Sequence, residues 1–416
     1  MADPNATMFQ LNRDAKFHFE ILRGLSLAAY DGADVGECLV AAKSILPGDL
    51  ESFASSFAQV ASSVLSRALS VANDKLRVYA RTAFFSAATY FRAADFFLHG
   101  NPADARIMTY WAAQTDAFDQ GLALLSPPGQ RFTVRTPNFD VPCIWLTPNY
   151  EVRQRPTIIM GNGFDGSQEE MLHVAGLAAL ERGYNVLTYE GPGQPSVRRY
   201  QNKGFIAEWE QVVTPVLDHV LSNRSDQVDP DAVALYGLSL GGYLAARTAA
   251  FEHRFAAIVL MDGVWDFGAV VRRAFEPRAL KLHDAGDKTA FDELARRYLR
   301  PGVPAGLRWA LEQGLWAFDT TSPFDFVSRA SEFTLERVAR RIKTPVLIGS
   351  AEDDAAFEGQ AQQLARALGK YGRLHEFTNE QLAGTHSGFG ALKQQNQVVF
   401  DWLARVFDGQ GGGRCE

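Results

Sequence analysis

The chain has 416 residues, of which 47% are hydrophobic and 12% are aromatic, and its formal net charge is −7 at pH 7. This size and composition predict one large domain with a sizeable core and one or two smaller domains. The acidic balance and the lack of a long basic run argue against a nucleic acid partner, and no apolar run approaches the length of a membrane span.

The cysteines and the N-terminal residues indicate the compartment. Cys38, Cys143 and Cys415 are odd in number and far apart, a pattern typical of free thiols in a reducing compartment. Residues 1–19 lack the charged and apolar regions of a secretory signal peptide. We therefore expect a cytoplasmic protein, and we expect the glycine-rich residues 409–416 to form a flexible tail.

Residues 1–128 are predicted to form an N-terminal helical accessory domain. Apolar residues recur at helical spacing over 53–68, a second long helix ends at about His99, and a third runs over about 102–125. This domain is expected to cover a pocket, to build a homodimer, or to do both, and the sequence leaves these alternatives open.

From residue 129 onward, short apolar strands alternate with helical segments. A hairpin is expected at 131–134 and 141–146. Further strands are expected at 157–160, 185–189, 233–236, 257–261, 345–349 and 374–377. Such alternation predicts an α/β fold with a mostly parallel sheet that helices cover on both faces.

The alternation lapses over 263–341, which is helical in pattern and rich in Arg, Phe and Trp. We expect a helical lid, inserted between the core segments 129–262 and 342–408 and lying over the carboxyl ends of the strands, where ligands bind. Its aromatic content favours a hydrophobic small-molecule substrate. Trp265 and Trp316 are candidates for contact with that substrate, with core packing as the alternative for each of them.

One turn carries the strongest chemical signal. The sequence Gly-Leu-Ser-Leu-Gly at 237–241 follows an apolar strand and leads, through Gly242, into a good helix former. This is the pattern of a nucleophile elbow. Glycine relieves the clash of side chains two positions from the serine, and the helix N-terminus favours developing negative charge. Ser239 is therefore the predicted nucleophile.

Ser239 needs a base, because a free hydroxyl is a poor nucleophile. His386 lies late in the chain, in a glycine-flanked loop before the last helix, and is the predicted base. The acid should follow the strand at 345–349, where Asp353 and Asp354 are both available and Glu352 is a less favoured third candidate. An aspartate there would orient the imidazole and stabilise its cation.

Backbone amides are expected to form an oxyanion hole. One belongs to Leu240, the residue after the nucleophile, and the other to the loop after 157–160, where Gly163 and Phe164 are the candidates. The neighbouring carboxylate of Asp165 is expected to hold the loop through backbone hydrogen bonds, with a direct part in substrate binding or catalysis as the alternative.

Two further carboxylates follow the strand after the elbow helix. Asp262 and Asp266 lie near the place of a second acid–base group, and Asp266 is also a candidate for substrate binding. The remaining histidines are scattered without the spacing of metal ligands, and no dinucleotide or phosphate loop is present. We therefore expect neither a metal ion nor an organic cofactor.

These motifs resemble the α/β-hydrolase family. Three stretches narrow the resemblance: 161–167 (Gly-Asn-Gly-Phe-Asp-Gly-Ser), 189–194 (Tyr-Glu-Gly-Pro-Gly-Gln) and 351–354 (Ala-Glu-Asp-Asp), the last followed by Gly-Gln at 359–360. With the helical N-terminal segment, they are similar to a subgroup of carbon–carbon bond hydrolases. Some of these shorten polyketides in pigment biosynthesis, and one cleaves a pseudo-oxynicotine. The resemblance covers about 15–408.

The resemblance implies roles for particular residues. It favours Phe164 over Gly163 as the second oxyanion donor, and the spacing to the later Gly-Gln pair favours Asp354 over Asp353. It implies a serine hydrolase that forms an acyl-enzyme on a hydrophobic polyketide-type ester, thioester or ketone, with a carrier protein as one source of the substrate.

Two other functions stay open from the sequence. The same acyl-enzyme, attacked by a hydroxyl group instead of water, would make the protein an acyltransferase or a cyclase that forms an ester or a macrolactone. A non-catalytic receptor for a small ligand would also retain this fold and these residues.

Overall fold

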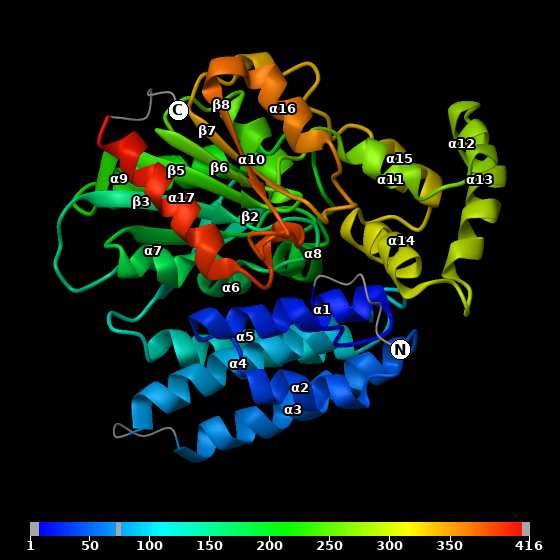
Figure 1. Ribbon diagram of the computed structural model, residues 1–416, viewed down its shortest axis with the longest axis horizontal. Helices are drawn as coiled ribbons and strands as arrows, with labels where there is room; N and C mark the ends of the chain where they lie inside the picture. Colours follow the sequence, from blue (N-terminus) through cyan, green and yellow to red (C-terminus); the bar gives the residue numbers. More distant parts are fainter. Residues whose placement is uncertain (1–7, 72–75, 410–416) are drawn as a thin grey trace. The chain divides into compact units, whose positions relative to one another are not determined.

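The computed structural model describes residues 8–71 and 76–409. Cys415 and the predicted tail beyond Gly409 therefore lie outside the described residues. By its internal contacts the chain divides into two compact units, whose elements are labelled in Figure 1. Unit 1 comprises Met1–Gly129, Pro277–Trp316 and Thr320–Phe324, and unit 2 comprises Gln130–Glu276, Ala317–Asp319 and Asp325–Glu416.

Unit 1 is helical, as the apolar periodicity predicts for the N-terminal segment. Its helices are α1 (Ala15–Ser26), α2 (Val35–Ser44), α3 (Leu50–Val71), α4 (Arg77–Asp95), α5 (Arg106–Ala123), α12 (Pro277–Asp284), α13 (Lys288–Ala295) and nearly all of α14 (Ala305–Ala317). The Asp14 side chain caps α1 by accepting hydrogen bonds from the first turn. Phe17, Phe53 and Phe97 form part of the core, with ring centroids 4.8 to 5.1 Å apart.

Unit 2 is built on an eight-stranded sheet with the order β1-β2-β4-β3-β5-β6-β7-β8. The strands are β1 (Gln130–Arg135), β2 (Asp140–Leu146), β3 (Arg155–Gly161), β4 (Asn185–Tyr189), β5 (Val228–Leu238), β6 (Ala257–Met261), β7 (Val346–Ala351) and β8 (Gly372–Phe377). The pairs β1–β2 and β2–β4 are antiparallel, and the other neighbours are parallel. The predicted hairpin and mostly parallel sheet are confirmed.

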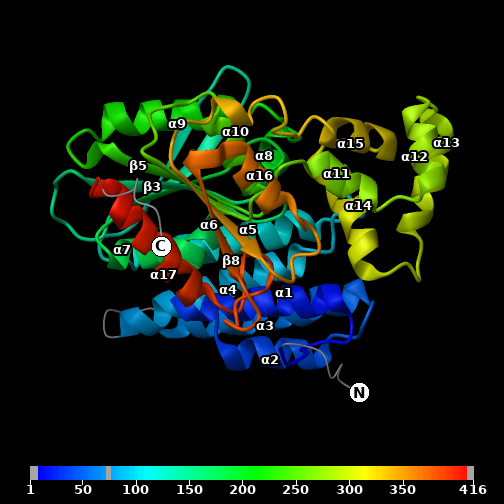
Figure 2. The same ribbon diagram turned by 45° about the horizontal axis from the view of Figure 1, so that its top comes forward.

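Helices cover both faces of this sheet. The helices of unit 2 are α6 (Gln168–Met171), α7 (Leu177–Glu181), α8 (Pro195–Gln201), α9 (Glu210–Asn223), α10 (Gly241–Ala249), α11 (Phe267–Arg273), most of α15 (Pro323–Ala330), α16 (Gln360–Leu368) and α17 (Leu392–Phe407). Figure 2 shows α9 and α10 on one face and α7 and α17 on the other. Within 8–71 and 76–409, none of the helices combines the length and the apolar character that crossing a membrane requires.

The stretch predicted as a lid, 263–341, is mostly helical and is divided between the two units. Its middle part, Pro277–Trp316, packs with the N-terminal helices in unit 1, whereas α11 and most of α15 belong to unit 2. That the stretch covers a substrate stays a prediction.

The register of the sheet decides which loops meet. Gly161 of β3 lies opposite Gly237 of β5, and Leu238 lies opposite Met261 of β6. Because β7 runs parallel to β6, the loops after β3, β5, β6 and β7 all leave the same edge of the sheet. The predicted site residues of unit 2 come largely from these loops.

Candidate active site

The turn between β5 and α10 has the strained geometry of a nucleophile elbow. Ser239 has φ of 58°, in the left-handed region that residues other than glycine rarely adopt. A Cβ on Gly237 would lie 1.9 Å from the carbonyl oxygen of Gly241, and a Cβ on Gly242 would lie 1.7 Å from that of Asp262. Both positions therefore require glycine, which the sequence pattern predicts for Gly237 but not for Gly242.

Three side chains that are far apart in the sequence meet at this turn. His386, in the loop between β8 and α17, has its Nε2 atom 3.1 Å from the Oγ atom of Ser239. The Nδ1 atom of the same ring lies 2.8 Å from the Oδ2 atom of Asp354, which follows β7. The result is a continuous hydrogen-bonded chain through which a serine proton can pass to an imidazole that a carboxylate orients.

The structure distinguishes the two adjacent aspartates. Asp354 is buried, and its Oδ1 atom accepts hydrogen bonds from the backbone N–H groups of Ala356 and Phe357, at 3.1 and 3.3 Å. Asp353 is exposed, and its carboxylate accepts a hydrogen bond of 2.8 Å from the Asn379 side chain. Asp354 is therefore the residue that reaches His386.

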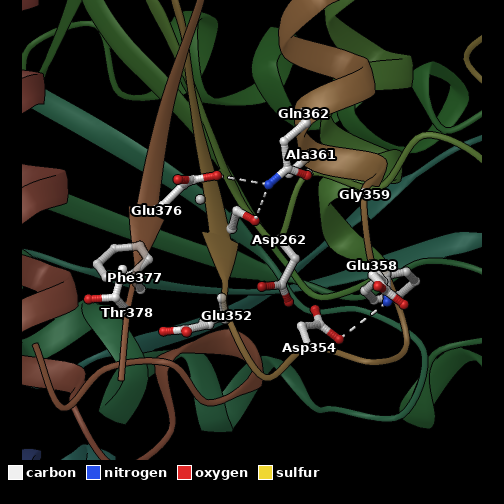
Figure 3. Close-up of a pocket in the computed structure, with 15 residues that line it drawn as sticks. Asp262, Glu352, Asp354, Glu358, Gly359, Ala361, Gln362, Glu376, Phe377 and Thr378 are labelled. Atoms are coloured by element: carbon white, nitrogen blue, oxygen red, sulfur yellow. Dashed lines mark hydrogen bonds between the residues drawn. The ribbon is translucent and has the colours of Figure 1, made fainter. Parts of the chain in front are cut away.

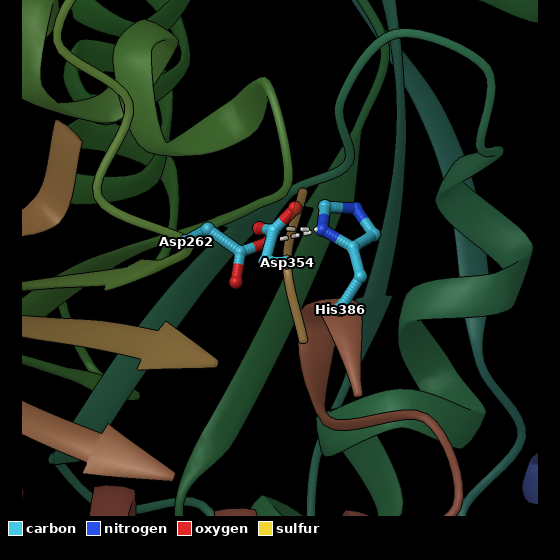
Figure 4. Close-up of side chains that lie close together, drawn as sticks. All are labelled: Asp262, Asp354 and His386. Carbon is cyan, nitrogen blue, oxygen red and sulfur yellow. Dashed lines mark hydrogen bonds and ion pairs between the residues drawn. The ribbon is translucent and has the colours of Figure 1, made fainter. Parts of the chain in front are cut away.

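A second carboxylate reaches the same imidazole. The Oδ2 atom of Asp262, directly after β6, lies 3.1 Å from Nδ1 of His386 and accepts a hydrogen bond of 3.0 Å from the Ser387 hydroxyl. Figure 4 shows the carboxylates of Asp262 and Asp354 on the same side of the ring. The sequence predicts only that Asp262 lies near the place of a second acid–base group, and it does not predict the contact with His386. The signal for that contact is the position of Asp262 at the end of the strand that lies next to β5.

These charges govern the protonation of the site. Burial by itself would lower the pKa of His386, but Asp262, Asp354 and Asp165 together raise it to about 9. Burial raises the pKa of Asp262 to about 6, against the opposing effect of His386. Burial would also raise the pKa of Asp354, yet His386 and two backbone N–H groups lower it below its usual value. The two carboxylates on the Nδ1 side of the ring therefore favour the protonated form of the imidazole.

The loop after β3 packs closely against the elbow. A Cβ on Gly163 would lie 2.7 Å from both the carbonyl oxygen of Leu238 and the backbone nitrogen of Leu240. The N–H group of Gly163 donates a hydrogen bond of 2.7 Å to the side-chain oxygen of Asn162. The amide of Gly163 is thus engaged within its own loop, and Phe164 as the loop's oxyanion donor stays a prediction.

Side chains of the motif at 189–194 form hydrogen bonds with the backbone in and around the loop after β3. The buried Gln194 side chain donates hydrogen bonds of 2.7 and 3.2 Å to the carbonyl oxygens of residues 162 and 163. The fully buried carboxylate of Glu190 accepts hydrogen bonds from the backbone N–H groups of Gln168 and Ser196, at 2.9 and 2.6 Å. Both side chains therefore fix the backbone around the expected oxyanion hole.

An aromatic cluster within unit 2 adjoins this loop. The half-buried ring of Phe164 lies 5.3 Å from that of Phe267 and 6.1 Å from that of Phe205. Phe318 and Phe333 extend the cluster, at 5.5 and 6.3 Å from Phe205. The other four rings are buried, and Phe164 is the half-buried member of the cluster. An apolar side chain at this place suits a hydrophobic ligand.

The other predicted contact residues lie at several places in the fold. Asp266 caps α11 through a hydrogen bond of 2.7 Å, and the backbone N–H of Trp265 donates to Gln360 at 2.8 Å. Trp316 belongs to unit 1, where its ring stacks on that of His99 at 5.0 Å. Asp165 is half-buried, and its negative charge acts on His386. Substrate contact by Asp165, Trp265, Asp266 and Trp316 stays a prediction.

A pocket of about 360 Å³ adjoins the two acids, between β7, β8 and α16 (Figure 3). Asp262 and Asp354 line it together with the carboxylates of Glu352, Glu358 and Glu376, whereas Ser239 and His386 do not. Its acidic lining does not suit a hydrophobic substrate. The pocket instead lies on the carboxylate side of the imidazole.

The same cluster is where a cation would find ligands. Among the described residues, one ligand atom each from Asp262, Asp354 and His386 lie within 4.8 Å of one another. The Nδ1 atom of His386 is 2.8 Å from Asp354, with which it forms a hydrogen bond, and 3.1 Å from Asp262, with which it forms an ion pair when protonated.

A sequence profile described as the alpha/beta hydrolase family matches residues 158–389. Hydrolase LUC6 of a Fusarium species is 32% identical over 425 residues, which cover 96% of this chain and 98% of LUC6. The 20-hydroxy-prefusarin hydrolase FUS2 of Gibberella moniliformis is 30% identical, over 94% of this chain and 96% of FUS2.

Solved structures share the fold at low sequence identity. The 2,6-dihydroxy-pseudo-oxynicotine hydrolase is 20% identical with a TM-score of 0.69, over 94% of this chain and 97% of its own. Wild-type AbyA5 is 16% identical with a TM-score of 0.60, over 95% of this chain and 100% of its own. In both comparisons nearly the whole length of the chain is matched.

Proposed function

Because the chain belongs to the alpha/beta hydrolase family, we propose that it is a serine hydrolase that forms an acyl-enzyme on a hydrophobic polyketide-type ester, thioester or activated ketone. The observation that carries the proposal is the hydrogen-bonded chain from Ser239 through His386 to Asp354. The name of the relative FUS2, a 20-hydroxy-prefusarin hydrolase, supports a small organic molecule as substrate.

In the first half-reaction, the Oγ atom of Ser239 attacks the substrate carbonyl carbon while Nε2 of His386 accepts the serine proton. The N–H groups of Leu240 and Phe164 would bind the oxyanion, and the carboxylate of Asp354 would stabilise the imidazolium. Collapse of the tetrahedral intermediate breaks the C–O, C–S or C–C bond. The imidazolium then gives its proton to the leaving group.

In the second half-reaction, water attacks the acyl-enzyme while His386 accepts a proton from it. The imidazolium then returns this proton to the Oγ atom of Ser239 as the bond between Oγ and the acyl carbon breaks, and the free acid leaves. Carbon–carbon cleavage adds one requirement. The leaving carbanion must be delocalised as an enolate or a phenolate before it is protonated, so a β-dicarbonyl compound or an acylated phenol would qualify.

The surroundings of Ser239 support an apolar substrate. Phe164 is only half-buried and is joined to an aromatic cluster within unit 2. An acyl chain or an aromatic ring can pack there, whereas a sugar or a charged metabolite would lose hydration without finding polar partners.

Turnover of aryl esters with graded acyl length tests the proposal. We expect hydrolysis to free acid that improves with chain length, and we expect Ser239→Ala to lose about 10³-fold or more in kcat. Asp353→Asn, the matched control beside the triad acid, should retain wild-type turnover. Undiminished turnover in Ser239→Ala would refute the proposal, and a lactone or ester product from a hydroxyacyl substrate would replace hydrolysis by acyl transfer.

A further inference from the structure

We propose that Asp262 is a second positioning carboxylate of the imidazole base, sharing the Nδ1 side of His386 with Asp354. The proposed function assigns one acid to the triad, and Asp262 is additional to it. The inference rests on the proposed function only for its kinetic consequence, because the protonation of His386 can be measured without turnover.

The two acids reach the ring from adjacent strands. β6 and β7 pair in parallel, with Leu260 opposite Ile348, so the residues that follow these strands leave the sheet at the same edge. The Oδ2 atom of Asp262 is 3.1 Å from Nδ1 of His386, and that of Asp354 is 2.8 Å away. Asp262 is 4% exposed and Asp354 is 7% exposed, so solvent screens neither charge well.

Each acid is held by a different part of the chain. Asp354 is fixed by backbone N–H groups of its own loop, at Ala356 and Phe357. Asp262 is instead bound by the hydroxyl of Ser387, the residue that follows His386, and Ser387 is buried. Asp262 therefore fixes the backbone loop that carries His386. Asp354 contacts that loop only through the imidazole ring.

Asp262 also connects this loop to the nucleophile. A Cβ on Gly242, in the first turn of the elbow helix, would lie 1.7 Å from the Asp262 carbonyl oxygen. The N–H group of Ser239 donates a hydrogen bond to the carbonyl oxygen of Met261, the residue before Asp262. The backbone of Asp262 thus touches the elbow, while its side chain touches the histidine loop.

A single N–H group cannot make two full-strength hydrogen bonds, so the second acid acts mainly through its charge. The charged groups that raise the pKa of His386 include Asp262, Asp354 and Asp165, from the loops after β6, β7 and β3. Burial alone would lower the pKa of His386, whereas the charges of Asp262 and Asp354, the hydrogen bond with Asp354 and the charge of Asp165 raise it to about 9. Two carboxylates this close repel each other unless a cation lies between them.

This arrangement has two opposed effects on the reaction. It stabilises the imidazolium that forms when Ser239 is attacking and that later protonates the leaving group. It also favours protonation of the resting base, and a protonated imidazole cannot accept the serine proton. The pH dependence of kcat/KM should therefore report the charge of Asp262.

The decisive experiment is an NMR titration of ¹⁵N-histidine-labelled protein, without substrate, for the wild type, Asp262→Asn and Asp353→Asn. We expect His386 to titrate at about 9 in the wild type and about 1 to 3 units lower in Asp262→Asn. Asp353→Asn is the matched control, because its carboxylate contacts Asn379, and it should titrate like the wild type. An unchanged His386 titration in Asp262→Asn would overturn the proposal.

Asp354→Asn keeps the proposal testable if Asp262→Asn does not fold. With Asp262 still in place, His386 should titrate above its ordinary pKa of about 6.5, whereas a value at or below 6.5 would contradict a shared role. Where esters are turned over, the rising limb of kcat/KM should move to lower pH in Asp262→Asn. A uniform loss at every pH would instead indicate a merely structural residue. If no ester is turned over, the proposed function fails while the titration still decides this inference.

Discussion

Replacing Gly163 with alanine tests how closely the loop after β3 must approach the nucleophile. The added Cβ would lie 2.7 Å from the Leu238 carbonyl oxygen and the Leu240 nitrogen, and 3.1 Å from the Gly241 nitrogen. Ordinary contact begins at 3.4 Å, so the two backbones must separate by about 0.7 Å. Since these atoms belong to the backbone, no flexible side chain can absorb the shift. A displacement of about 1 Å can lower a rate by about 100-fold, so we expect a loss of about 10- to 100-fold in kcat.

The assay is ester turnover combined with thermal unfolding. Gly24→Ala is the matched control, because no atom lies within 4 Å of a Cβ added at Gly24 in α1. That variant should keep wild-type kcat and gain about 0.5–1 kcal/mol in stability, the helix preference for alanine over glycine. A folded Gly163→Ala protein with more than half of the wild-type kcat would refute the close approach of this loop to the oxyanion.

Three further predictions follow from the same geometry. His386 must be neutral to accept a proton, and its pKa is about 9. The value of kcat/KM should therefore rise about tenfold per pH unit up to that pH and then level off. A flat profile between about pH 6 and 8, measured with a substrate that does not titrate, would contradict this expectation. Gln194→Ala leaves two buried carbonyl oxygens without the side chain that donates to them. Urea unfolding should show a free energy of unfolding lower by about 1–3 kcal/mol, and kcat should fall as well. Unchanged stability would argue against a role of Gln194 in holding the loop after β3. Gly242→Ala places a Cβ 1.7 Å from a backbone oxygen, so the variant should lose about 3 kcal/mol or fail to fold, and wild-type unfolding would show that the elbow can relax.

Much of the fold could be predicted from the sequence, because its signals are local. Every predicted strand has a counterpart, and the longest error is in β5, which begins at Val228, before the expected 233–236. The elbow could be recognised because glycine, serine and glycine at fixed spacing are required by one turn. The predicted resemblance to the α/β-hydrolase family is confirmed by the profile match over 158–389.

What the sequence left open depends on contacts between distant segments. Asp353 and Asp354 are adjacent, and only the folded loop turns one toward His386 and the other toward Asn379. The contact of Asp262 with His386 follows from the order of β6 and β7 in the sheet and from the course of a loop 125 residues further on. Local patterns contain neither kind of information.

The division of 263–341 between the two units has the same cause. Its helical pattern is visible in the sequence, but the choice of packing partner for Pro277–Trp316 depends on the tertiary structure. The predicted lid function, carrier-protein partner and homodimer therefore stay predictions.

The central claim is that Ser239 becomes acylated, and intact-mass measurement after mixing with an activated acyl ester tests it most directly. The account predicts a mass increase equal to the acyl group, located on the peptide that contains Ser239, and absent from Ser239→Ala. Product formation without an adduct on Ser239, or with equal speed in Ser239→Ala, would contradict it.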